Sequence, residues 1–116
     1  SLEIIPTGYI LIDGGKKCAV HRVSKTQPLA QSEVEIIVDT ALAGEYSGKK
    51  LIYLEAGSGA NNPVSSRIIT AVKEALTIPL IVGGGIRSRE QLEAAYTAGA
   101  DMVVIGTAFE NGDYFL

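Results

Sequence analysis

PLIVGGGIRSREQLEAAYTAGADMVVI, the sequence of residues 79–105, contains a strand, a glycine loop, a helix and a second strand. A strand tolerates proline at its first position, so Pro79 opens an apolar strand that runs into the glycine triplet. Ser88 and Gln91 have the spacing of a capping box, which predicts the start of a helix. Gly99 predicts its end. The buried face of this helix is expected to contain three residues at helical spacing: Leu92, Ala95 and Tyr96.

The same alternation extends toward the N-terminus. Short apolar runs predict two further strands, at residues 8–12 and 51–55, and the second strand of the first stretch is residues 102–105. Ser32 and Glu35 form a second capping box, and Asn62 is expected to cap a further helix with Pro63 in its first position. Near-continuous apolar strands between amphipathic helices predict an α/β fold with a parallel sheet.

Size and composition limit the class of protein. The chain has 116 residues, of which 47% are hydrophobic, and a net charge of −3. A complete (β/α)8 barrel needs roughly 250 residues, so we expect residues 1–116 to form a single partial barrel domain, truncated at both ends, with an exposed apolar interior. The acidity argues against nucleic-acid binding. No apolar run reaches roughly 18 residues and no signal peptide is visible, which predicts a cytoplasmic location.

Glycine-rich segments follow three of the predicted strands, at residues 57–59, 83–85 and 106–107. The carboxyl ends of parallel strands meet at one rim, where glycines let backbone N–H groups approach an anion. One such segment can be merely a tight turn. Three at successive strand ends favour a phosphate site.

Glu55 is a more specific candidate, because a carboxylate is unexpected at the end of an apolar strand. Tyr53 lies two residues earlier and so faces the same side of the sheet. A carboxylate at this position can accept a hydrogen bond from a substrate hydroxyl and remove its proton. The alternative is a solvated charge at a strand end. Asp101 is expected to start the last strand rather than to act in catalysis.

Four segments together resemble the geranylgeranylglyceryl phosphate synthases and their heptaprenyl relatives: YLEAGSGA at 53–60, IPTGYI at 5–10, IVGGGIR at 81–87 and VIGT at 104–107. The resemblance implies the C-terminal half, about strands five to eight, of a TIM (β/α)8 barrel. It also implies transfer of a prenyl group, expected to be geranylgeranyl, from a prenyl diphosphate to the sn-3 hydroxyl of sn-glycerol 1-phosphate. The product would be an ether phospholipid precursor.

The resemblance also implies roles for single residues. Glu55 would bind the glycerol hydroxyls and act as the catalytic base. The other residues expected to bind substrate are two tyrosines and the strand-end loops: Tyr9, Tyr53, Leu54, Ala56, Gly57, Ser58, Gly59, Gly84, Gly85, Gly106 and Thr107. The family often has asparagine where this chain has Thr107, but the backbone N–H at that position is the same.

Mg²⁺ is the cofactor that the resemblance implies, with its ligands in the N-terminal half of the barrel and none in this sequence. It further implies a homo-oligomer with peripheral membrane contact, and residues 1–116 alone are expected to be inactive. Two alternatives remain open. A sugar-phosphate isomerase barrel would need an acid/base partner for Glu55 that is not visible in the sequence. A non-catalytic half-barrel would only bind phosphate and dimerise.

Overall fold

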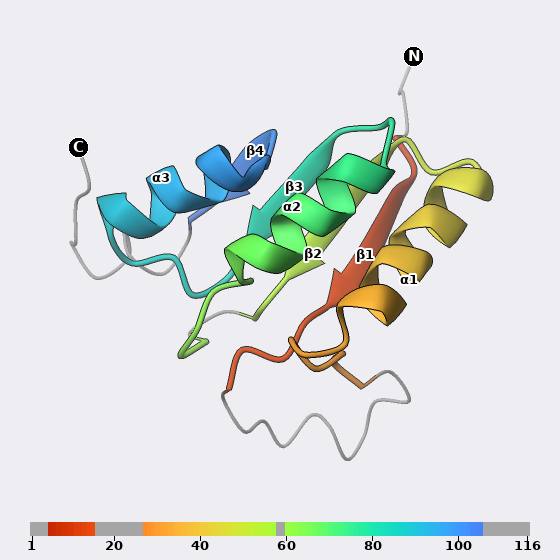
Figure 1. The fold of residues 1–116 in the computed structure, drawn as a ribbon. Coiled ribbons are helices and arrows are strands. Elements are labelled where there is room, and N and C mark those ends of the chain that lie inside the picture. The colour runs from red at the N-terminus through yellow and green to blue at the C-terminus, as the bar shows by residue number, and fades with distance from the viewer. Residues whose placement is uncertain (1–4, 16–26, 58–59, 106–116) are drawn as a thin grey trace.

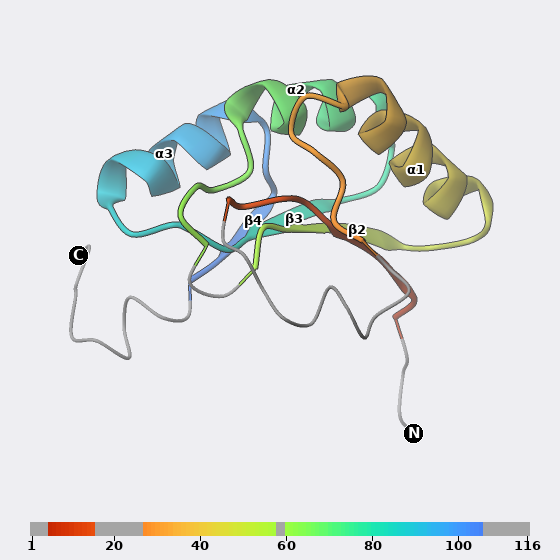
Figure 2. The same ribbon diagram turned by 90° about the horizontal axis from the view of Figure 1, so that it is seen from below.

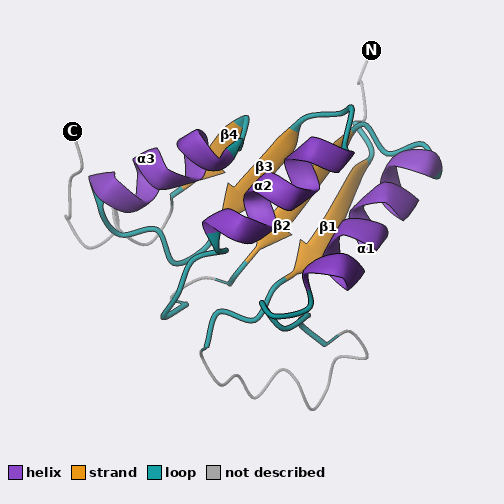
Figure 3. Ribbon diagram, viewed as in Figure 1, coloured by secondary structure: helices purple, strands orange, loops and turns teal. Residues whose placement is uncertain are grey.

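The computed structural model describes residues 5–15, 27–57 and 60–105. Strands and helices alternate along these residues (Figures 1 and 3). In chain order they are β1 (Thr7–Leu11), α1 (Val34–Tyr46), β2 (Leu51–Glu55), α2 (Ser66–Ala75), β3 (Leu80–Gly83), α3 (Arg89–Ala98) and β4 (Met102–Val104). The predicted order of strands and helices is confirmed.

The strands form one parallel sheet in the order β1-β2-β3-β4. Each strand therefore pairs with its successor in the sequence, and a helix connects each pair, which is the repeat of a (β/α)8 barrel. The register places four residues in one row across the sheet: Tyr9, Tyr53, Ile81 and Met102. The next row, closer to the carboxyl ends of the strands, contains Leu11, Glu55, Gly83 and Val104.

The two faces of the sheet differ. All three helices cover one face (Figure 2), where Ile52, Leu54 and Val82 are completely buried against them. The opposite face carries the two rows described above, and Tyr9 and Met102 on it are 58% and 54% exposed. This is the face that lines the interior of a complete barrel, and its exposure agrees with the expectation for a half-barrel.

The start and end of α3 follow the sequence pattern. The Ser88 hydroxyl accepts a hydrogen bond from the Gln91 N–H (3.1 Å), and Gly99 ends the helix with a φ of +127°. The prediction for Tyr96 was wrong, because its side chain is 46% exposed instead of facing the core. Its hydroxyl accepts a hydrogen bond from the Val103 N–H (3.3 Å).

Two of the predicted helix caps were wrong. Helix α1 is preceded by Glu33, not Ser32, and no side chain caps it. Helix α2 begins after Ser65, whose hydroxyl accepts the Ile68 N–H (3.2 Å), three residues later than the cap predicted at Asn62. The segment at Asn62 instead packs against the β1–α1 loop, where the Asn62 N–H donates to the carbonyl of Gly14 (3.0 Å).

Candidate functional site

The loops after β1, β2 and β3 meet at the C-terminal rim of the sheet, the rim at which the strands end. The Ile12 N–H donates to the Glu55 carbonyl (2.8 Å), and the Ala56 N–H donates to the Gly83 carbonyl (2.9 Å). The three loops are therefore joined by main-chain hydrogen bonds into one surface. Glu55, Gly57, Gly84 and Gly85, which are candidate residues at the strand ends, lie on this surface.

Glu55 is the last residue of β2 and lies on the face of the sheet that the helices leave open. Its Oε2 accepts a hydrogen bond from the Gly57 N–H (2.9 Å). A Cβ atom added at Gly84 would lie 2.8 Å from Oε2, and one added at Gly83 would lie 3.1 Å from Oε1. The carboxylate thus sits on the same rim as the glycine loop after β3, which is the arrangement expected from the sequence.

Tyr9 and Tyr53 lie next to this carboxylate on the open face, in the row before it. They are paired in register on β1 and β2, and their ring centroids are 5.1 Å apart. Burial raises the pKa of both phenols, and the negative charge of Glu55 and hydrogen bonding to it raise these pKa values further. Both phenols therefore stay protonated at neutral pH and can act as hydrogen-bond donors beside the carboxylate.

The glycines after β3 allow two loops to touch. Gly84 and Gly85 have φ values of +91° and +75°, a region that L side chains rarely adopt. A Cβ at Gly84 would lie 2.6 Å from the Gly57 nitrogen, and one at Gly85 would lie 2.8 Å from the Pro63 nitrogen. The main chain of the β2–α2 loop can approach the β3–α3 loop this closely only because these side chains are absent.

Two of the predicted site residues turn their side chains away from the open face of the sheet. Leu54 is completely buried on the helix side and Ala56 is 7% exposed, so neither side chain faces the open side with Glu55. Four further predicted residues lie outside the residues that the structure describes: Ser58, Gly59, Gly106 and Thr107. No group of three or more metal-ligating side chains occurs within residues 5–15, 27–57 and 60–105.

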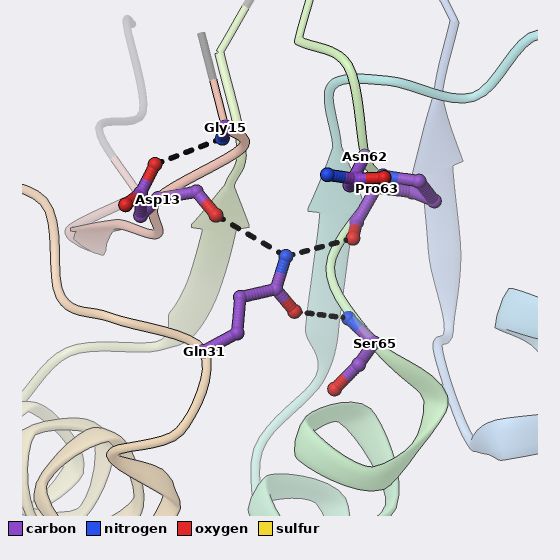
Figure 4. Close-up of a pocket in the computed structure, with 6 residues that line it drawn as sticks. All are labelled: Asp13, Gly15, Gln31, Asn62, Pro63 and Ser65. Atoms are coloured by element: carbon purple, nitrogen blue, oxygen red, sulfur yellow. Dashed lines mark hydrogen bonds between the residues drawn. The ribbon is translucent and has the colours of Figure 1, made fainter. Parts of the chain in front are cut away.

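Sequence reasoning missed a second polar feature beside the rim. An open pocket of about 560 Å³ lies between the β1–α1 and β2–α2 loops (Figure 4). It is lined by Asp13, Gly15, Gln31, Asn62, Pro63 and Ser65. Gln31 lies in the β1–α1 loop, and its side chain extends across the pocket and binds main-chain groups of both loops. No motif marks Gln31, because its partners are 18 to 34 residues away in the sequence.

Comparisons with known proteins agree with this fold. The model of the PcrB family matches residues 1–115. A geranylgeranylglyceryl phosphate synthase from Zunongwangia profunda is 66% identical over 113 residues, which cover 97% of this chain and 48% of the relative. The enzyme of the same name from Pyrococcus furiosus is 46% identical, with coverages of 96% and 43%. The chain spans about half the length of the curated relatives it matches.

Solved structures give the same result. The (S)-3-O-geranylgeranylglyceryl phosphate synthase from Thermoplasma acidophilum, in complex with its substrate sn-glycerol-1-phosphate, matches with a TM-score of 0.83 and 42% identity. The match covers 91% of this chain and 42% of that one. The enzyme from Thermoplasma volcanium gives a TM-score of 0.80 and 44% identity. The predicted half-barrel fold is confirmed, and the chain belongs to the PcrB family, which includes the geranylgeranylglyceryl phosphate synthases.

Proposed function

We propose that the protein is a prenyltransferase that joins geranylgeranyl diphosphate to the sn-3 hydroxyl of sn-glycerol 1-phosphate. The observation that carries the proposal is the position of the Glu55 carboxylate, which faces the open side of the sheet within reach of Gly84. Support comes from the relatives named geranylgeranylglyceryl phosphate synthase and from the neighbour solved with sn-glycerol-1-phosphate. The product is an ether phospholipid precursor.

The main chain of the rim is the proposed phosphate site. Because the Gly57 N–H is already donated to Glu55, we assign the phosphate to the backbone N–H groups of Gly84 and Gly85. The undescribed residues Ser58, Gly59, Gly106 and Thr107 belong to the same proposed site. Glu55 Oε2 already accepts the Gly57 N–H, so Oε1 is the carboxylate oxygen that we assign to the glycerol hydroxyls.

Glu55 is also the proposed base. A free alcohol is a weak nucleophile, so a carboxylate positioned at the sn-3 hydroxyl speeds the reaction by removing the proton as the new bond forms. The hydroxyl oxygen bonds to C1 of the prenyl chain while the bond from C1 to the diphosphate breaks. The diphosphate leaves with the bonding electron pair, and the proton passes to Glu55. Tyr9 and Tyr53 donate from the same face and orient the carboxylate and the substrate.

Mg²⁺ is the proposed cofactor, and it would supply charge neutralisation to the departing diphosphate. The residues that the structure describes bring no three metal-ligating side chains together. We assign its ligands, and much of the prenyl groove, to barrel strands outside this sequence, and we expect the 116 residues alone to be inactive. From the resemblance to the same family, we also propose that the protein is a cytoplasmic homo-oligomer with peripheral membrane contact. In the described part of the chain, no helix is long and apolar enough to span a bilayer.

Product formation by the full-length protein tests this function. Labelled sn-glycerol 1-phosphate is supplied with geranylgeranyl diphosphate and Mg²⁺, and we expect a labelled ether product. The enantiomer sn-glycerol 3-phosphate serves as the control, because it offers the same phosphate with its free hydroxyls in the mirror arrangement. If sn-glycerol 1-phosphate gives no ether product, the proposed activity is refuted. If the two enantiomers give equal amounts of product, the proposed stereochemistry is refuted.

A further inference from the structure

Gln31 makes three hydrogen bonds with its side-chain amide, and they join two loops (Figure 4). Its Nε2 donates to the carbonyl of Asp13 (3.2 Å), in the β1–α1 loop, and to the carbonyl of Pro63 (3.0 Å), in the β2–α2 loop. Its Oε1 accepts the N–H of Ser65 (2.8 Å), directly before α2. A single side chain therefore fixes both sides of the pocket.

These partners require an amide in this position. Turned around, the amide would place Oε1 against two carbonyl oxygens and its NH₂ group against an N–H, so the hydrogen-bond network fixes the orientation. A glutamate in its place could still accept the Ser65 N–H but could donate to neither carbonyl when ionised. Only an amide side chain at position 31 can therefore make all three hydrogen bonds.

The segment that Gln31 holds is the one that touches the glycine loop after β3. The Asn62 and Pro63 main chain lies 2.8 Å from the position that a Cβ of Gly85 would occupy. On the other side of the rim, the main chain of Gly57 makes the equivalent approach to Gly84. Both ends of the β2–α2 loop thus rest on the same pair of glycines, and a shift of Pro63 would change how the loop meets them.

Gln31 lies in the β1–α1 loop, and two further residues of that loop, Gly14 and Gly15, also bind the segment. The Asn62 N–H donates to the Gly14 carbonyl (3.0 Å), and the Asn61 side chain donates to the Gly15 carbonyl (3.3 Å). A Cβ at Gly14 would lie 2.5 Å from the Ala56 carbonyl oxygen, so this contact is also a close one. The β2–α2 loop is held between two neighbours, and Gln31 is the side chain that binds it at Pro63 and Ser65.

We propose that Gln31 is a positioning residue for the glycerol-phosphate site, an inference that rests on the proposed function. It acts through the β2–α2 loop and does not touch the substrate. By fixing Pro63 and the start of α2, it holds residues 62–65 against Gly85 in the glycine loop after β3. Loss of its hydrogen bonds weakens the binding of sn-glycerol 1-phosphate about tenfold and leaves the binding of the prenyl diphosphate unchanged.

The experiment uses the full-length protein with Gln31→Leu and Gln31→Glu. Titration calorimetry gives the Kd for sn-glycerol 1-phosphate, steady-state kinetics gives the KM for each substrate, and thermal unfolding gives Tm. The matched control is Glu45→Leu, because Glu45 also joins two segments, accepting the N–H (2.8 Å) and hydroxyl (2.9 Å) of Thr77, but does so where the strands begin. We expect all three variants to lower Tm and only the Gln31 variants to raise the Kd.

The outcomes separate the positioning role from a general loss of stability. Wild-type affinity in Gln31→Leu, or an equal loss of affinity in Glu45→Leu, would overturn the proposal. Wild-type affinity in Gln31→Glu would overturn it too, because that variant loses both donated hydrogen bonds. If the wild-type protein binds sn-glycerol 1-phosphate but forms no ether, only the proposed function fails. If it does not bind that ligand, both proposals fail.

Discussion

The N-terminal rim of the sheet, where the strands begin, ties its carboxylates to structural partners. Asp101 accepts hydrogen bonds from the Leu80 N–H (2.8 Å) and from the ammonium group of Lys73 (2.6 Å). Glu45 accepts two hydrogen bonds from Thr77, one of them from a backbone N–H. These hydrogen bonds hold the pKa of both carboxyls below its usual value. The predicted role of Asp101 at the start of β4 is confirmed.

The C-terminal rim holds its carboxylate differently. Glu55 accepts one backbone N–H, from Gly57, and faces the phenols of Tyr9 and Tyr53. The neighbouring main chain is rich in glycine, so it presents N–H groups instead of side chains. Stability residues gather at one rim of a barrel and reactive residues at the other, and the roles proposed for Glu55 and Asp101 follow that division. The comparison predicts which substitutions change catalysis and which change only stability.

Glu55→Gln gives the largest expected effect on activity. The substitution keeps the size and hydrogen-bonding reach of the side chain but removes the base, so kcat should fall by about 10²- to 10⁴-fold. The affinity for sn-glycerol 1-phosphate should change far less, because the amide oxygen still accepts the Gly57 N–H and the NH₂ group can donate to a glycerol hydroxyl oxygen. Turnover and calorimetry on the full-length protein measure the two quantities. Glu45→Gln at the other rim is the control, and full activity in Glu55→Gln would exclude the base role.

Gly84→Ala should reduce both stability and substrate affinity. Its φ of +91° costs alanine about 1–2 kcal/mol, and its Cβ would lie 2.6 Å from the Gly57 nitrogen. Gly48→Ala is a matched control, because Gly48 has a φ of +105° before β2 but no atom within 4 Å of an added Cβ. Urea unfolding should show a loss in both variants, larger for Gly84→Ala. Only Gly84→Ala should weaken the binding of glycerol phosphate, and equal effects on binding would contradict the comparison.

The features predicted correctly are those that local sequence decides. The apolar runs at β2 and β3 determine where these strands lie in the sequence, and the alternation of side chains along a strand places Glu55 and Tyr53 on one face. The cap at Ser88 needs only a hydroxyl three residues before a backbone N–H. The roles of these residues in binding and catalysis stay predictions, since geometry alone does not test them.

The features missed are those that contacts between distant segments decide. The pattern at Asn62 and Pro63 favours a helix start, yet Asn62 donates to Gly14, 48 positions earlier, and the helix begins later. Gln31 has no local pattern at all, because its partners lie in two separate loops. Such contacts follow from how three strand-end loops pack against one another, and no single stretch of sequence contains that information.

Tyr53→Phe should have an intermediate effect. Because its raised pKa keeps the phenol protonated, the substitution removes a donor beside the Glu55 carboxylate. A hydrogen bond to a charged group contributes roughly 1.5 kcal/mol at the lower end of its range, so kcat/KM should fall about tenfold. Tyr46→Phe is the control, because Tyr46 is 78% exposed at the end of α1. An unchanged kcat/KM in Tyr53→Phe would remove this phenol from the proposed site.

Asp101→Asn should have the smallest effect, confined to stability. The hydrogen bond from Lys73 lowers the pKa of Asp101 below about 3.9, its usual value in an unfolded chain. Its contribution is therefore complete above that pH and is lost as the pH falls through the lower, folded-state pKa. The two side chains are 34% and 44% exposed, so solvent screening limits the loss at pH 7 to about 1 kcal/mol or less.

Urea unfolding from pH 7 to pH 2 measures this effect, and the stability of Asp101→Asn should fall less steeply below pH 4 than that of the wild-type protein. Lys73→Met is the companion variant, because it removes the cation and keeps the hydrogen bond from the Leu80 N–H to Asp101. It should show part of the same change. Since both residues lie at the rim opposite Glu55, kcat/KM should be unchanged in both variants. A kinetic defect in Asp101→Asn would mean that the two rims are coupled and that the division between them is incomplete.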